Sequence, residues 1–178
     1  MAAETIEILD NNGTDRALTR IAHEILEKNK GIDDLVVIGI RTGGAYLAAR
    51  LKEKLVEIEG RDVPLGLIDV TMYRDDISSR NNLEVGQTDI RFSVSGKKII
   101  LVDDVLFTGR TIRAAMEAVM DLGRPQNIQL AILVDRGHRE LPIRPDYIGR
   151  NLPTARNEQI EVDFDNKNNP QAVLLLRN

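Results

Sequence analysis

The sequence predicts an α/β fold in which helices cross over between the strands of a parallel sheet. Short apolar runs such as residues 35–40 and 128–134 have the composition of strands that are buried on both faces. Stretches with the periodicity of amphipathic helices lie between these runs. Polar loops follow two of the runs, and ligands bind to parallel sheets beyond the carboxyl ends of the strands.

Each element is expected from its own local pattern. The expected helices cover residues 15–30, 45–58 and 110–122. The expected strands cover residues 35–40, 65–70, 98–102, 128–134, 160–164 and 172–176. Residues 71–97 and 135–158 show no clear periodicity, so loops are expected there. No linker or repeat interrupts the chain, and we expect one domain over residues 1–178.

The composition excludes several kinds of site. The chain has 178 residues and a net charge of −4, so nucleic acid would be attracted only by a local basic patch. It has no cysteine, which excludes disulfides, thiolate metal sites and a cysteine nucleophile. Neither a secretory signal core nor an apolar run of about 20 residues is present. We therefore expect a cytoplasmic protein without a membrane span.

Residues 99–111, IILVDDVLFTGRT, carry the clearest chemical signal. The apolar residues 99–102 predict a strand that ends at Asp103 and Asp104, and residues 108–111 form a small, hydroxylated turn before a helix. The N–H groups of this turn and the helix dipole attract a phosphate. The carboxylates can accept hydrogen bonds from sugar hydroxyls. An ordinary acidic turn would explain the two carboxylates alone, but the whole motif favours a sugar-phosphate site.

This stretch resembles the PRPP-binding motif of type I phosphoribosyltransferases. In that motif the two acids hold the ribose hydroxyls and the Thr/Gly loop holds the 5′-phosphate. The positions that match are Asp103, Asp104, Val105, Leu106, Phe107, Thr108, Gly109, Arg110 and Thr111.

Two further loops match parts of the same enzymes. Arg41, Thr42, Gly43 and Gly44 resemble the pyrophosphate loop, although a plain tight turn explains them equally well when they are taken alone. Residues 71–76 resemble the mobile catalytic loop, in which Arg74 would reach the pyrophosphate. A solvated lid without chemistry is the alternative interpretation of this second loop.

Both histidines lie in basic surroundings. On the helix expected over residues 15–30, Thr19, Arg20 and His23 share one face with neighbouring charges. The second set covers residues 136–144, with Arg150 beyond it. A solvated surface would explain each set alone. The two sets would form one basic surface only if they fold together, which the sequence leaves open.

Taken together, five segments are similar to the PyrR family of bifunctional pyrimidine-operon regulators and uracil phosphoribosyltransferases. The segments are ALTRIAHEI, GIRTGGAYLA, DVTMYRDDIS, IILVDDVLFTGRT and DLGRPQNIQLAILVDRGHRELPIRPDYIGRNLPT. The resemblance spans roughly residues 15–165. It implies a type I phosphoribosyltransferase fold, with a central parallel sheet, flanking helices and a small C-terminal hood.

The resemblance also implies a reaction and its site. Uracil and PRPP would give UMP and pyrophosphate, with Mg²⁺ carried by PRPP and no direct metal ligand from the protein. Asp103, Asp104 and Arg74 would be catalytic. Arg136 and a backbone contact near Ile160 would lie close to the base. The one departure is Gly43, where members of the family usually have arginine and where this chain is closer to purine salvage enzymes.

The second activity implied by the resemblance is UMP-dependent binding to pyrimidine operon mRNA, which causes transcription attenuation. The matching positions are Thr19, Arg20, His23, Lys28, His138, Arg139, Arg144 and Arg150. A homodimer or larger homo-oligomer is implied as well. Two alternatives remain: a salvage phosphoribosyltransferase without an RNA-binding role, and an RNA-binding sensor without turnover. The intact pair of Asp103 and Asp104 argues against the second.

Overall fold

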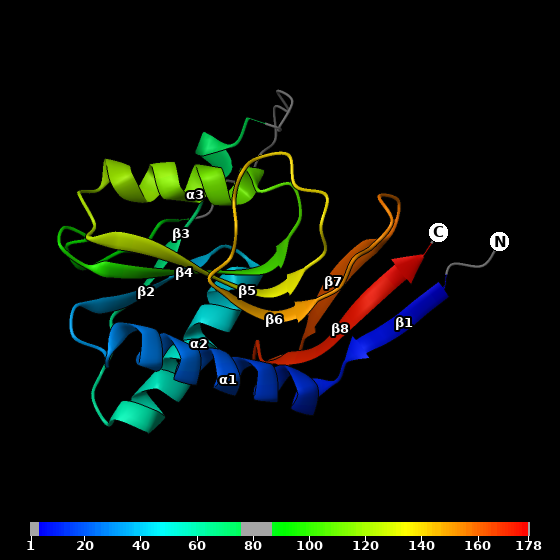
Figure 1. Cartoon of the computed structure of the whole chain (residues 1–178), viewed down its shortest axis with the longest axis horizontal. Coiled ribbons are helices and arrows are strands. Elements are labelled where there is room, and N and C mark those ends of the chain that lie inside the picture. The colour runs from blue at the N-terminus through cyan, green and yellow to red at the C-terminus, as the bar shows by residue number, and fades with distance from the viewer. Residues whose placement is uncertain (1–3, 76–86, 178) are drawn as a thin grey trace.

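The computed structural model describes residues 4–75 and 87–177, and it shows an α/β core with a smaller sheet at one end (Figure 1). The helices are α1 (Asn11–Asn29), α2 (Gly43–Glu59), α3 (Arg110–Asp121) and the 3₁₀ turn η1 (Thr71–Tyr73). The strands are β1 (Glu4–Leu9), β2 (Leu35–Ile40), β3 (Leu65–Ile68), β4 (Lys98–Leu106), β5 (Asn127–Asp135), β6 (Tyr147–Asn151), β7 (Gln159–Phe164) and β8 (Pro170–Arg177).

The central sheet has the strand order β3-β2-β4-β5-β6, and all of its neighbouring strands are parallel. Helices α1 and α2 cover one face and α3 covers the other (Figure 1). Parallel strands connected by helices on both faces form the architecture that the alternating sequence pattern predicts. The expected central parallel sheet with flanking helices is therefore confirmed.

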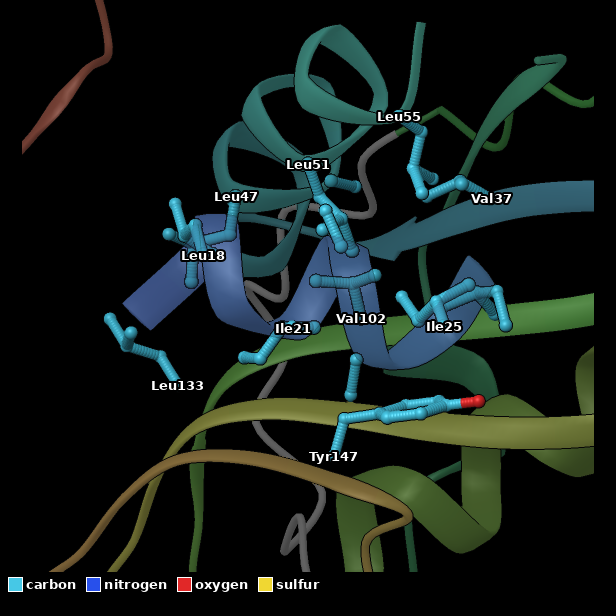
Figure 2. Packing of buried hydrophobic residues seen from close by; sticks show 14 of the residues in the cluster. Leu18, Ile21, Ile25, Val37, Leu47, Leu51, Leu55, Val102, Leu133 and Tyr147 are labelled. Atoms are coloured by element: carbon cyan, nitrogen blue, oxygen red, sulfur yellow. The ribbon is translucent and has the colours of Figure 1, made fainter. Parts of the chain in front are cut away.

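The larger of the two cores lies between the sheet and the helices α1 and α2. In Figure 2, Leu18 and Ile21 of α1 lie near Leu47 and Leu51 of α2 and near Val102 of the sheet. These side chains are buried, and the α1 residues recur at the three- and four-residue spacing of one helix face. This packing fixes β4, whose carboxyl end carries the acidic pair.

A second, antiparallel sheet has the strand order β1-β8-β7, and we call it the hood. Its apolar side chains, among them Ile160 and Val162, pack against the larger core. The sequence predicts a hood near the C-terminus, but β1 supplies one of its three strands. That prediction is corrected here: the hood is built from both ends of the described chain, since Glu4 pairs with Arg177.

Two other expectations are also corrected. Strand β4 does not end before Asp103, because the residues that follow still pair with β5, as Val105 does with Val134. Strand β6 lies within residues 135–158, which the sequence predicts to be irregular. Asp76 of the expected catalytic loop, and residues 77–86 of the longer loop expected over residues 71–97, lie outside the described residues. Within the described part of the chain, no helix is both long and apolar enough to cross a membrane.

Candidate functional site

The acidic pair lies at the carboxyl end of β4, the central strand of the sheet. Asp103 is only 8% exposed, whereas Asp104 is half-buried. The backbone N–H of Asp104 donates to Asp103 Oδ1 at 2.9 Å, and the N–H of Val105 donates to Asp104 Oδ1 at 2.7 Å. These local hydrogen bonds orient both carboxylates before any ligand binds.

Burial raises the pKa of Asp103 well above its ordinary value. The neighbouring carboxylate of Asp104 raises it further, while the positive charge of Arg74 opposes the shift. A buried carboxylate that is costly to ionise gains from a ligand that brings hydroxyl donors or cations. Burial therefore favours the neutral form of Asp103.

The shift at Asp103 makes a prediction about stability. A carboxyl group whose pKa is higher in the folded state contributes stability below its unfolded pKa, and this contribution is lost as the pH rises through the folded value. We expect Asp103→Asn to raise the melting temperature by a few degrees near pH 8, and by less near pH 4. Thermal unfolding at both pH values measures this, and a larger gain near pH 4 would contradict it.

A cavity of about 170 Å³ lies beside the acidic pair. Its lining residues are Arg74, Asp103, Val105, Leu106, Phe107, Thr108, Gly109, Thr111 and Ile112. We call residues 105–111 the phosphate loop. Gly109 has a φ of 92°, in the left-handed region that favours glycine, and α3 begins at the next residue. The cavity is thus bordered by a helix N-terminus, where free N–H groups attract an anion.

The expected pyrophosphate loop, residues 41–44, meets the acidic pair from the neighbouring strand β2. A Cβ atom on Gly44 would lie 2.4 Å from the carbonyl oxygen of Val102, and one on Gly43 would lie 2.2 Å from Asp104 Oδ2. Only glycine allows so close an approach. The structure therefore places this loop beside the acidic pair, as the sequence predicts. It also explains both glycines, because a side chain at either position would overlap β4 or Asp104.

The described part of the catalytic loop is attached to α3. Arg113 donates to the carbonyl oxygen of Tyr73 at 2.8 Å, and the Tyr73 hydroxyl donates to Asp121 at 2.8 Å. Arg110 forms an ion pair with Asp75 at 2.9 Å. Arg74, which lies between Tyr73 and Asp75 in the sequence, lines the cavity together with Asp103. The structure therefore brings Arg74 together with the acidic pair, as expected.

Arg136 connects the phosphate loop to the hood. Its guanidinium lies 4.0 Å from the ring centroid of Phe107, and its Nη2 donates to the carbonyl oxygen of Glu158 at 2.7 Å. Its side chain also donates to the Thr154 hydroxyl at 3.1 Å. Burial lowers the pKa of Arg136. Ile160 lies two residues beyond Glu158 on β7, so both residues expected near the base border the junction between core and hood.

The donors at the site suit a metal ion that arrives with its ligand. Within residues 4–75 and 87–177, no cluster of three or more His, Cys, Asp or Glu side chains is placed to hold a metal. Asp103 offers its carboxylate oxygens at the cavity, and the half-buried Asp104 follows it on β4. Mg²⁺ takes about six oxygen ligands and is often held by one or two carboxylates plus phosphates. The residues present fit that arrangement.

The two basic sets meet at β6, the edge strand of the central sheet. From α1, Arg20 donates to the carbonyl oxygens of Ile148 and Gly149, both at 2.8 Å. Lys28 lies 2.8 Å from Asp146 at the start of the same strand. Arg150 lies on β6 itself. Folding thus places three cations of the RNA-binding prediction around one strand.

Three further members of the RNA-binding prediction have other surroundings. Arg144 borders a cavity on the α3 face of the sheet. His138 is half-buried, with its ring edge against Phe107 and Nε2 2.5 Å from the carbonyl oxygen of Thr154. The Thr19 hydroxyl donates to the carbonyl oxygen of Asp15 within α1. Arg144 therefore shares a cavity with Asp146, the partner of Lys28, whereas the His138 ring packs against Phe107 of the phosphate loop.

Comparison with known proteins agrees with this geometry. The model of the phosphoribosyl transferase domain family matches residues 4–167. A bifunctional protein PyrR of Geobacter sp. (strain M21) is 64% identical over 176 residues, which cover 98% of this chain and 99% of that protein. The bifunctional protein pyrR of Enterococcus faecalis (strain OG1RF) is 54% identical over 95% of both chains. The chain belongs to the PyrR family.

Solved structures show the same fold outside the PyrR family. The hypoxanthine phosphoribosyltransferase of Trypanosoma cruzi matches with a TM-score of 0.72 and 20% sequence identity, over 96% of this chain and 95% of that chain. At this identity the likeness concerns the fold alone. The expected family and fold are confirmed, while the roles of individual site residues stay predictions.

Sequence reasoning missed one part of the site. The guanidinium of Arg139 points inward, where Nη1 donates to the carbonyl oxygen of Phe107 at 2.8 Å. The resemblance to the PyrR family places Arg139 with the RNA-binding residues. Asp135 is the sequence feature that could have predicted this contact. It lies four residues before Arg139, at the end of a buried strand, and forms an ion pair with it.

Proposed function

We propose that the protein is a UMP-responsive regulator of pyrimidine operon expression that binds leader mRNA and also converts uracil and PRPP to UMP and pyrophosphate. One observation carries the proposal: Asp103, the phosphate loop and Arg74 border a single cavity, and Asp104 is the next residue on β4. Relatives named as bifunctional PyrR proteins match nearly the whole chain and support the second activity.

In the proposed reaction the protein positions PRPP and stabilises charge. Asp103 and Asp104 accept hydrogen bonds from the two ribose hydroxyls, and their negative charge favours the positive charge that develops on the ribose. The N–H groups of the phosphate loop hold the 5′-phosphate. Arg41 and Arg74 offset the charge of the leaving pyrophosphate. Mg²⁺, bound by PRPP and approached by the acidic pair, would supply further charge neutralisation.

Uracil would bind where the core meets the hood. The proposal places it near Arg136 and the backbone of Ile160, since the hydrogen bonds of Arg136 to Thr154 and Glu158 keep this junction in a fixed position. Closure of the catalytic loop would exclude water from the reactive sugar. Backbone donors and acceptors on β7 suit a ring with alternating carbonyl and N–H groups.

The proposed RNA surface follows β6 and the adjoining face of α1. Arg20, Lys28 and Arg150 supply its cations, with His23 on the same helix. The protein as a whole is acidic, so binding depends on this local charge and should be sensitive to salt. We also propose that the protein acts in the cytoplasm, where its RNA and PRPP would be found, and as a homo-oligomer.

A filter-binding titration with a pyrimidine leader RNA, with and without UMP and at two salt concentrations, tests the regulatory half. We expect UMP to tighten binding. If about three phosphates are contacted, log K should fall with log salt with a slope of about −2. Arg150→Ala should weaken binding, whereas Arg61→Ala, which alters an exposed cation beside β3 at the opposite edge of the sheet, should not.

A salvage enzyme without an RNA-binding role is the second candidate. Two cations of the proposed surface are already paired within the protein, Arg20 with Glu24 and Lys28 with Asp146. This pairing reduces the positive charge that RNA would meet. Absence of RNA binding at both salt concentrations, together with turnover of uracil, would favour the salvage enzyme.

A further inference from the structure

Arg139 is bound on three sides within the protein. Its Nη1 donates to the carbonyl oxygen of Phe107 at 2.8 Å, and its Nε donates to the carbonyl oxygen of Ile143 at 2.8 Å. Its Nη2 forms an ion pair with Asp135 at 2.7 Å, and only 23% of the side chain is exposed. All three nitrogens of the guanidinium therefore have partners, in the fork geometry that arginine alone provides.

Residues 139–143, which we call the segment around Arg139, also form hydrogen bonds with the next peptide group of the phosphate loop. The backbone N–H groups of Glu140 and Leu141 both donate to the carbonyl oxygen of Thr108, at 2.9 and 3.3 Å. Gly109 lies directly against the segment, since a Cβ atom there would be 3.3 Å from Ile143. Two consecutive carbonyl groups of the phosphate loop are thus fixed from outside the loop.

Fixing these carbonyl groups fixes the N–H groups that belong to the same peptides. In a trans peptide the C=O and N–H bonds point in opposite directions. The carbonyl of Phe107 shares its peptide with the N–H of Thr108, and the carbonyl of Thr108 shares its peptide with the N–H of Gly109. Both carbonyls point toward the segment, and the cavity beside Asp103 has no lining residue from it. The two N–H groups are therefore turned away from the segment.

We propose that Arg139 is a positioning residue for the phosphate loop: it orients the N–H groups that bind the phosphate of PRPP and of UMP, and it affects RNA binding only through UMP. The inference rests on the proposed function, and it removes Arg139 from the set of direct RNA contacts. A direct contact would require the guanidinium to leave the partners that hold it, including a charged one.

The test compares Arg139→Ala and Arg139→Lys with the unaltered protein in two assays. Steady-state kinetics gives KM for PRPP and kcat, and calorimetry gives the Kd of UMP without any turnover. We expect Arg139→Ala to raise KM for PRPP and the Kd of UMP by roughly tenfold, with a smaller effect on kcat, because a charge-assisted hydrogen bond is lost. Arg139→Lys keeps the positive charge but loses the planar guanidinium. Its KM for PRPP and its Kd of UMP should therefore lie between those of Arg139→Ala and those of the unaltered protein.

RNA retention, measured at low and at saturating UMP, separates an indirect role from a direct one. For Arg139→Ala we expect weak RNA binding at low UMP and normal binding at saturating UMP. For Arg150→Ala, on the proposed RNA surface, we expect weak binding at every UMP concentration. Arg61→Ala, at the opposite edge of the sheet, is the matched arginine control and should leave KM, UMP binding and RNA binding unchanged.

Two outcomes would overturn the proposal. The first is an unchanged KM for PRPP and an unchanged Kd of UMP in Arg139→Ala. The second is a loss of RNA binding that persists at saturating UMP, which would make Arg139 a direct RNA contact. If the unaltered protein binds no RNA, the regulatory function fails, and the kinetic and calorimetric results still decide the role of Arg139.

Discussion

Asp104→Asn is expected to lower kcat for UMP formation by roughly 100-fold, since the ribose loses a charged acceptor as positive charge develops on it. The amide oxygen of asparagine can still accept the N–H of Val105, which Asp104 Oδ1 accepts at 2.7 Å. The fold of the loop should therefore survive, and the loss should appear in kcat rather than in stability. Steady-state assays with uracil and PRPP measure the effect.

The control for this variant is Asp33→Asn. Asp33 is exposed and paired with Arg61 beside β3, far from the cavity, so its loss should leave kcat unchanged. An unchanged kcat in Asp104→Asn would remove Asp104 from the proposed mechanism. A large fall in melting temperature would instead show that its charge supports the fold.

Gly44→Ala should reduce kcat/KM by about 100-fold and lower the melting temperature by several degrees. The added Cβ would lie 2.4 Å from the carbonyl oxygen of Val102 and 3.0 Å from the Cα of Asp103. Both atoms belong to the backbone of β4, so either β4 or α2 has to move. Overpacking of this kind costs about 1–3 kcal/mol and would displace the acidic pair. Kinetics and thermal unfolding on the same preparation measure both effects.

Gly43→Ala is the matched comparison. There the added Cβ meets Oδ2 of Asp104, the end of a side chain that can rotate. We therefore expect a smaller loss of stability than in Gly44→Ala, with kcat lowered because Asp104 is turned. Normal activity in Gly44→Ala would show that the two loops are farther apart than described.

The sequence was a good guide wherever one local pattern determines the structure. The run Leu35–Ile40 and the helix of residues 110–121 form within one or two residues of their expected bounds. The phosphate loop lies where its motif predicts, between β4 and α3. Buried strands and glycine-rich turns carry their information within a few neighbouring residues, which is why these parts could be predicted.

Other features depend on residues that are far apart in the sequence. Strand β6 has only five residues, includes Gly149 and Arg150, and forms through pairing with β5. Strand β1 shows no regular alternation of polar and apolar residues, and it pairs with the last described strand. The inward contact of Arg139 depends on how a loop folds back on another. No local pattern reports such pairings, so they could not be predicted.

The two-ended hood has a consequence for the order in which the protein can fold during synthesis. Strand β1 leaves the ribosome before the strands of the central sheet, but β8, its partner in the described chain, leaves after all of them. The central sheet can be complete once β6 has emerged. The hood is then completed only after the central sheet, and a nascent chain that still lacks β8 has its phosphate loop but not its hood.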